Sequence, residues 1–524
     1  MNLYDGLRHQ AKLNPSAPAV SCGDAQYTYG QFNERVLRLG NALTDQGVRK
    51  GDRVATLLLN CHRYLELYYA TAVIGVTIVP LNYRLAPKEL EYIMNDSESG
   101  TLFTDENFLQ LIEPVMAELK SLKRTIFTSG VKEVPDGMLD YETLIAESST
   151  GMPSVTVEEE DLSGIFYTGG TTGLAKGVML SHRNLRSNAY HNLMNFPFEN
   201  GGEGEVYCHA APMFHLANGA AMYANVIHGS KHTFVKMFDP KVLLELIQKE
   251  RITMVILVPA MINFVVNYPE VGNYDISSLR TIVYGAAPMP VELLKKAMEV
   301  IGCDFIQGYG MTETSPTLTI LYSDEHHTEG PEKLTRRLLS CGREIIGVEV
   351  RIVNEDGQDV KPGEVGEIIA RGPNIMQGYW KKEAETEAVL KNGWYYTGDI
   401  GTIDDEHYIF LLDRKKDMII SGGENVYSTE VENAIYTHPA VLEAAVIGVP
   451  DEKWGEAVKG IVVLKPGAEA TAEEIIEHCR DSIAGYKVPK SIEFMDELPK
   501  SGAGKILKRD LREKYYAGRE RRIS

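Results

Sequence analysis

Residues 167–184 read YTGGTTGLAKGVMLSHRN, and this stretch decides how the rest of the chain is interpreted. Its first eight residues contain three glycines and three threonines. Glycine lets the backbone turn tightly and leaves N–H groups unhindered beside the hydroxyls, a combination that suits phosphate oxygens. Lys176 adds a mobile cation, and the strand-like run 177–180 that follows it indicates that the loop joins two strands. The spacing is not that of a Walker loop, in which Gly-Lys-Ser/Thr leads into a helix.

The loop resembles the signature YTSGTTGxPKGV of the adenylate-forming enzymes, which include acyl-CoA synthetases, 4-coumarate-CoA ligases, luciferases and the adenylation domains of peptide synthetases. Two positions depart from that signature, because Gly169 stands in place of the usual serine and Ala175 in place of the usual proline. One hydroxyl is lost and the loop has one rigid residue fewer. The resemblance implies a catalytic role for Thr168 and assigns the phosphate contacts to Thr168, Gly169, Gly170, Thr171, Thr172 and Lys176.

Two further motifs resemble the nucleotide pocket of the same family. YGAAP, residues 284–288, follows a strand and offers a backbone shelf of small residues for a flat base. QGYGMTET, residues 307–314, offers the Tyr309 ring for the other face of the base, the Thr312 hydroxyl for the α-phosphate and the Glu313 carboxylate for Mg²⁺. The resemblance implies that Glu313 is catalytic and holds the metal, and that the nucleotide contacts are Gly285, Ala286, Ala287, Pro288, Gln307, Gly308, Tyr309 and Thr312.

The remaining binding motifs lie between residues 396 and 423. YTGD, residues 396–399, places Asp399 where a carboxylate can accept hydrogen bonds from both ribose hydroxyls. By resemblance, Arg414 is a second ribose contact and Lys416 is the hinge about which the C-terminal part of the chain turns. Gly422 and Gly423 form a loop that, in the family, borders the tunnel for the pantetheine arm of CoA.

Two residues are candidates for catalysis or positioning outside the nucleotide motifs. LPKSGAGKILKRDL, residues 498–511, contains Lys505, which in the family bridges the substrate carboxylate and the α-phosphate. A preorganised cation there neutralises negative charge shared between the two groups in the transition state. PMFH, residues 212–215, resembles the acyl-pocket segment, and we expect His215 to position the reacting carbonyl and guard the thiol path rather than act as a general base.

Composition limits the remaining possibilities. The 524 residues exceed one ordinary domain, and the net charge of −20 argues against general nucleic-acid binding. The six cysteines form no CxxC pair, which fits a reducing compartment without structural zinc. The first residues show no secretory signal and no apolar run is long enough to span a bilayer, so we expect a cytoplasmic protein without an integral membrane segment.

Alternating helix and strand patterns predict an α/β fold. We expect a large N-terminal adenylation domain of doubly wound sheets over residues 1–413, with a small β-barrel subdomain over about 342–413. Residues 414–416 form the predicted hinge, and residues 417–524 a small, mobile α+β lid domain. Thr28 with Gln31, and Thr471 with Glu474, predict helix capping boxes.

The resemblance implies an AMP-forming acyl-CoA synthetase that uses ATP, Mg²⁺ and CoA. A carboxylic acid and ATP give acyl-AMP and pyrophosphate, and CoA then gives acyl-CoA and AMP. The apolar stretches 213–222 and 314–320 favour a hydrophobic acid, with medium- or long-chain fatty acids first, then cinnamates or benzoates, then short or sulfur-containing acids. A luciferase and a non-catalytic nucleotide-binding member stay open, whereas an amino-acid substrate is disfavoured because no aspartate lies near His215. Oligomeric state also stays open, including a homodimer.

Overall fold

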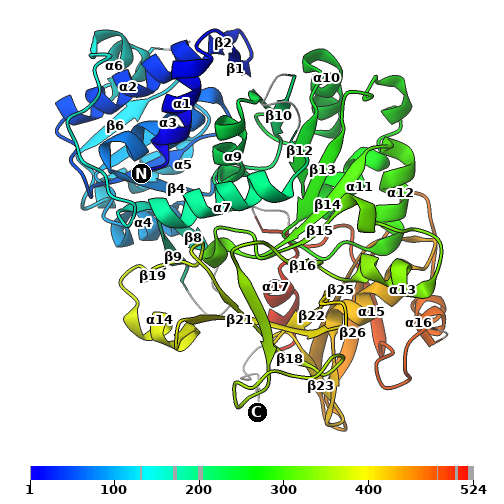
Figure 1. Ribbon diagram of the computed structural model, residues 1–524. Helices are drawn as coiled ribbons and strands as arrows, with labels where there is room; N and C mark the ends of the chain where they lie inside the picture. Colours follow the sequence, from blue (N-terminus) through cyan, green and yellow to red (C-terminus); the bar gives the residue numbers. More distant parts are fainter. Residues whose placement is uncertain are drawn as a thin grey trace.

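The computed structural model describes residues 2–129, 133–168, 174–198, 204–480, 482–501 and 505–516. In these residues the chain builds two large sheets, a smaller antiparallel sheet and a separate C-terminal sheet, with helices packed around them. Figure 1 shows the first part of the chain on the left, the green middle part on the right and the yellow and orange parts below. Within the described ranges, no helix combines the length and apolarity needed to cross a membrane.

The first large sheet contains the strands on both sides of the glycine- and threonine-rich loop. Its order is β19 (Gly378–Tyr379), β9 (Lys176–Ser181), β8 (Leu162–Thr168), β4 (Thr77–Pro80), β3 (Arg53–Leu57), β5 (Thr101–Thr104), β6 (Arg124–Phe127) and β7 (Leu139–Asp140). β8 and β9 run antiparallel and pair Thr168 with Lys176. The prediction that the loop joins two strands is therefore confirmed.

The second large sheet is mostly parallel and contains the strands before YGAAP and QGYGMTET. Its order is β16 (Arg343–Glu344), β15 (Thr319–Leu321), β14 (Asp304–Tyr309), β13 (Thr281–Gly285), β12 (Met254–Leu257), β10 (Val206–His209), β11 (Lys231–Phe234), β1 (Pro18–Cys22) and β2 (Ala25–Thr28). The first two strands of the chain thus pair far downstream, with β11. Neither large sheet is a contiguous piece of sequence.

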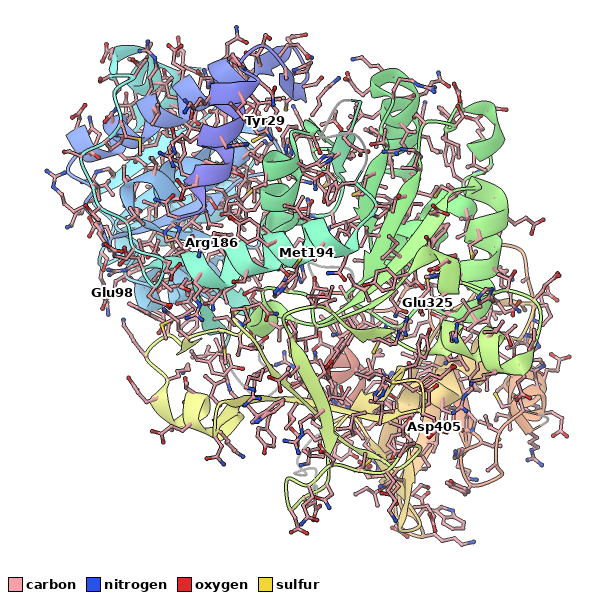
Figure 2. The ribbon with its side chains drawn as sticks, in the orientation of Figure 1. Tyr29, Glu98, Arg186, Met194, Glu325 and Asp405 are labelled. Atoms are coloured by element: carbon pink, nitrogen blue, oxygen red, sulfur yellow. The ribbon has the colours of Figure 1, made fainter. Side chains whose placement is uncertain are left out.

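Helices cover these sheets as the alternating pattern predicts. They are α1 (Tyr4–Leu13), α2 (Tyr29–Asp45), α3 (His62–Ile74), α4 (Pro87–Asp96), α5 (Leu109–Ile112), α6 (Tyr141–Glu147), α7 (His182–Asn195), α8 (Leu216–Gly219), α9 (Ala221–His228), α10 (Pro240–Glu250), α11 (Pro259–Val266), α12 (Val291–Ile301), α13 (Glu332–Thr335) and α14 (Glu383–Val389). Short 3₁₀ turns add η1 (Glu113–Glu118), η3 (Val271–Asn273), η4 (Thr312–Thr314), η5 (Ser323–Glu325) and η6 (Arg336–Leu339). Thr28 and Gln31 form the predicted capping box of α2. Figure 2 labels Arg186 and Met194 on α7, the helix that crosses the front of the molecule between the two lobes.

The third sheet lies where the β subdomain is predicted. It pairs β17 (Glu349–Val353), β18 (Gly366–Arg371), β21 (Trp394–Ile403) and β20 (Leu390–Lys391), and β22 (Ile409–Arg414) joins β21. Isoleucines and valines of β17, β18 and β22 share one hydrophobic core with Ile306 and Tyr309 of β14. This shared core fixes the position of β21 and β22 against the end of β14.

The C-terminal part forms an α+β unit of its own, as predicted. Its sheet pairs β24 (Glu424–Val426), β23 (Ile419–Ser421), β26 (Gly455–Leu464) and β25 (Val441–Asp451), and β27 (Ser491–Phe494) joins β26. α15 (Ser428–Tyr436) and α16 (Ala472–Arg480) share one core with this sheet, while Leu511 of α17 (Lys508–Glu513) joins a second core. Thr471 and Glu474 exchange the predicted capping hydrogen bonds.

Candidate active site

The carboxyl ends of β13 and β14 meet at one edge of the second sheet. The two strands are parallel, and Gly285 pairs in register with Gly308. A Cβ on Gly285 would lie 2.2 Å from the Gly308 carbonyl oxygen, so only glycine permits this approach. A Cβ on Gly308 would meet open space, and Ala286 turns away with a φ of 65°. Ala287 and Pro288 complete the turn, which leaves a shelf of small residues beside an open volume.

Asp399 lies between two partners at this edge. The Tyr309 hydroxyl donates to Asp399 Oδ2 at 2.9 Å, and Arg414 Nε lies 3.3 Å from Asp399 Oδ1. The register of β21 and β22 sets Asp399 directly opposite Arg414. Burial and the neighbouring carboxylate raise the pKa of the Tyr309 phenol well above its usual range, so its hydroxyl stays a donor. Asp399 is only 4% exposed, so these two partners fix its orientation inside the protein.

Tyr379 connects the glutamate of the TET turn to the lysine of the glycine- and threonine-rich loop. Its hydroxyl donates to Glu313 Oε1 at 3.0 Å, while Lys176 Nζ lies 5.0 Å from the centre of its ring. The connection exists because β19 pairs Tyr379 with Val178 of β9. Burial raises the pKa of Glu313, and a bound cation would counteract that effect by favouring the carboxylate.

A single half-buried carboxylate fits a magnesium ion that takes its other ligands from phosphate and water. Among the residues that the structure describes, no cluster of three or more His, Cys, Asp or Glu side chains is arranged to hold a metal on its own. The donor set therefore suits a metal that arrives with the nucleotide. Thr312 opens the η4 turn next to Glu313, three residues after Tyr309, which ends β14.

His215 caps the short helix α8. Its Nδ1 accepts a hydrogen bond from the Ala217 backbone N–H at 3.3 Å, which leaves the Nε2 position to carry the proton of the neutral ring. Burial and the charge of Lys505 lower the pKa of His215 to about 4. The ring is therefore neutral near pH 7, which suits a positioning group. Asn60 fixes the segment before it by accepting from Met213 N at 2.7 Å.

Lys505 belongs to the C-terminal part but lies among groups of the large domain. Ser501 N donates to the Lys505 carbonyl oxygen at 2.7 Å. Arg84 Nη1 lies 3.5 Å from the Ser501 carbonyl oxygen, and Lys500 Nζ lies 5.7 Å from the Phe264 ring. The side chain of Lys505 is exposed, yet the protein around it and the cations Arg414 and Lys416 lower its pKa to about 8.

The structure thus brings one group of predicted residues together and leaves another group apart. The first group joins Tyr309, Asp399 and Arg414 with Lys505 and His215. Gly422 and Gly423 instead form the exposed turn between β23 and β24, and Gly422 N donates to the Trp454 carbonyl oxygen. Figure 1 shows β23 at the lower edge of the molecule, away from β14. Gly169, Gly170, Thr171 and Thr172 lie outside the described residues.

Sequence reasoning missed the residues that hold these groups in place. Tyr379 is one of them. Asp96 is another, because Asp96 Oδ2 accepts from the Tyr167 hydroxyl at 2.5 Å just before the loop, while Tyr92 donates to the Ala175 carbonyl oxygen at 3.1 Å just after it. The one available signal was an aromatic pair, Tyr379 and Trp380, after the glycine of MQGYW. Gln307 was predicted, and its buried Oε1 has no partner among the described residues, which leaves an acceptor at the shelf.

Comparison with known proteins assigns the family. Residues 7–380 match the family model described as AMP-binding enzyme, and residues 430–505 match AMP-binding enzyme C-terminal domain. The chain is 38% identical over 507 residues to a feruloyl-CoA synthase of Amycolatopsis sp, covering 97% of each chain. It is 37% identical over 528 residues to a long-chain-fatty-acid–CoA ligase of Thermus thermophilus, covering 98% of this chain and 96% of the relative.

A solved structure agrees with the sequence relatives. The o-succinylbenzoate-CoA synthetase from Bacillus subtilis, solved in complex with ATP and a magnesium ion, superposes with a TM-score of 0.83 and 30% identity over 97% of this chain and 98% of that chain. Both family models and the curated relatives cover nearly the whole chain. The chain therefore belongs to the adenylate-forming AMP-binding enzymes and is an AMP-forming acid–thiol ligase.

Proposed function

We propose that the protein converts a hydrophobic carboxylic acid to its CoA thioester in two steps at one site. In the first step a carboxylate oxygen attacks the α-phosphorus of ATP, and the bond to the leaving pyrophosphate breaks. In the second step the CoA sulfur attacks the acyl carbon, and AMP leaves with the bonding electrons. The observation that carries the proposal is the buried Asp399 held by Tyr309 and Arg414, with Lys505 near enough for its charge to act on His215 and to be influenced by Asp399 and Arg414.

Each group has a defined task in the first step. The shelf at Gly285 and Gly308 accepts the base, and Asp399, oriented by Tyr309 and Arg414, accepts the ribose hydroxyls. Lys505 lies between the carboxylate and the α-phosphate and offsets the repulsion between two anions as they approach. Glu313 would hold Mg²⁺, which supplies positive charge to the phosphate oxygens. Thr168 and Lys176, at the two ends of the loop, bind the phosphates.

The second step requires a different surface of the C-terminal domain to face the active site. We assign residues 1–413 to the adenylation domain, 414–416 to the hinge and 417–524 to the lid. A rotation about Lys416 withdraws Lys505 and brings the turn at Gly422 and Gly423 to the cleft, where it borders the path of the CoA arm. The exposure of this turn, whose Gly422 N donates to the Trp454 carbonyl oxygen, supports a surface kept for that step.

For the acid, we propose a compact aromatic carboxylate of the cinnamate type. Met213, Met222 and Tyr223, close to His215 in the sequence, are buried in the core, and we take this packed segment to favour a short, flat acid over a long chain. The Tyr68 hydroxyl also donates to the Met213 carbonyl oxygen at 2.8 Å. The feruloyl-CoA synthase relative supports the same class. A medium- or long-chain fatty acid is the second candidate, supported by the Thermus thermophilus relative.

A panel of acids tests this proposal. The enzyme is given ATP, Mg²⁺ and CoA with ferulate, cinnamate, benzoate, octanoate or palmitate, and pyrophosphate and the CoA thioester are measured separately. We expect both products with the aromatic propenoic acids at the highest kcat/KM. A preference for palmitate would replace the aromatic assignment, and pyrophosphate release without any thioester would overturn CoA as the acceptor.

A further inference from the structure

A buried chain of polar contacts connects the two sides of the hinge. Asp413 lies in β22, on the side of the large domain, and Ser428 is the first residue of α15, on the other side. Both the backbone N–H and the hydroxyl of Ser428 donate to Asp413 Oδ2, each at 2.7 Å. Lys508 Nζ then donates to Ser428 Oγ at 2.5 Å and pairs with Glu432 Oε1 at 2.7 Å. One serine thus joins a carboxylate on one side of the hinge to an ion pair on the other.

The chain of contacts is protected from water, and Lys508 lies close to both of its carboxylates. Ser428 is fully buried, Asp413 is 6% exposed and Glu432 is 8% exposed. The carboxylates of Glu432 and Asp413 raise the pKa of Lys508 although burial alone would lower it. If one partner is removed from such a buried set, the remaining charged groups lose the contact that compensates their burial. Breaking any one of these contacts is therefore costly, and the intact set is held strongly.

These contacts bear on catalysis because Lys508 begins α17, three residues after Lys505. A second contact from α17, between Arg512 and Asp417 at 2.7 Å, ties the other end of the helix to the residue directly after the hinge. Leu507 N donates to the Pro499 carbonyl oxygen at 2.8 Å, so the turn that carries Lys505 is attached directly to this helix. The position of Lys505 in the active site therefore depends on how α17 is held at the hinge.

We propose that Asp413 and Ser428 form a latch across the hinge that holds Lys505 in the adenylating position and must open before the thiol step. The inference rests on the proposed two-step function and adds two positioning residues to it. Neither residue touches the reacting atoms. Their effect falls on the balance between the two arrangements of the C-terminal domain, and through it on one half-reaction more than the other.

Ser428→Ala tests the latch, because it removes the hydroxyl that links Asp413 to Lys508 and keeps the backbone N–H. We expect acid-dependent pyrophosphate release to fall about tenfold, because the neutral hydroxyl loses its two hydrogen bonds to charged partners, Asp413 and Lys508. Thioester formation from supplied acyl-AMP should stay the same or become faster. Ser491→Ala is the matched control, since Ser491 also accepts from a lysine, Lys459, in the same domain but away from the hinge.

A readout without substrates separates the latch from catalysis. Hydrogen–deuterium exchange of peptides covering the hinge and α17 should be faster in Ser428→Ala than in wild type, and unchanged in Ser491→Ala. Asp413→Asn, which keeps the shape of the side chain, should reproduce both the exchange and the kinetic change. Equal slowing of both half-reactions, or unchanged exchange, would overturn the latch. Absence of pyrophosphate release by the wild type with every acid would instead refute the proposed function.

Discussion

The groups proposed to bind the ribose and the lysine proposed to act in catalysis are held in place in different ways. Asp399 is fixed inside the large domain by a strand register and by hydrogen bonds from Tyr309 and Arg414. Lys505 comes from a turn of the C-terminal domain, and its position depends on contacts made across a hinge. In the proposed mechanism the nucleotide site is thus preformed, whereas the cation needed for one of the two steps is supplied by a part of the chain that leaves between them. Changes in the two regions should therefore affect the half-reactions differently.

The largest effect is expected for Lys505→Ala. Removing the cation that bridges two anions should slow pyrophosphate release by on the order of 100-fold or more. Thioester formation from supplied acyl-AMP should be nearly unaffected, because that step proceeds after the lysine has withdrawn. Rapid-quench assays of the two half-reactions measure both rates.

The control for this variant is Lys465→Ala, which removes an exposed lysine from the same domain. It should leave both rates at the wild-type level. If Lys505→Ala slows both half-reactions equally, the lysine does not leave between the steps and the difference between the two regions disappears.

Asp399→Asn should have the second largest effect and a different pattern. The amide cannot accept two ribose hydroxyls as strongly, and it loses the charge that Arg414 pairs with. We expect ATP affinity to fall roughly tenfold to a hundredfold, from the loss of charged hydrogen bonds. Binding of acyl-AMP should weaken by a similar factor because it carries the same ribose. Isothermal titration with ATP and with AMP measures the change, and an effect confined to the first half-reaction would contradict the assignment.

The sequence predicted those parts of the molecule that depend on local pattern. Glycines and threonines followed by an apolar run indicated a loop between strands, and Thr28 with Gln31 indicated a helix start; both are present. The contacts of Tyr379 were not predictable, because they require pairing between β19 and β9, which lie about two hundred residues apart in the chain. The hydrogen bonds between Asp413 and Ser428 could not be predicted for a different reason. Each residue alone is typical of a strand end or a helix start, so neither suggests a contact with the other.

The effect of pH should be smaller and should again follow Lys505. Its pKa is lowered to about 8 from an ordinary value near 10.5, and only the charged form neutralises the reacting anions. The rate of pyrophosphate release at low ATP should therefore fall as pH rises through about 8, reaching roughly a tenth of its plateau one unit higher. His215, with a pKa of about 4, does not titrate in this range.

The pH profile of Lys505→Arg is to be compared with that of the wild type. Arginine stays charged across the range, so the fall near pH 8 should disappear even if the rate itself is lower. A fall that persists in this variant would assign the titration to another group. The thiol step from supplied acyl-AMP serves as the internal reference, because Lys505 takes no part in it.

Tyr379→Phe should have the smallest effect, and it addresses the preformed region alone. The change keeps the ring beneath Lys176 and removes only the hydroxyl that donates to Glu313 at 3.0 Å. Because the glutamate keeps its charge but loses one partner that orients it, the Mg²⁺ concentration for half-maximal pyrophosphate release should rise by about threefold to fivefold. Tyr396→Phe, outside these contacts, should not shift it. If Tyr379→Phe alters the thiol step more than the Mg²⁺ dependence, Tyr379 acts on the mobile region rather than on the metal, and the division between a preformed site and a mobile lysine must be redrawn.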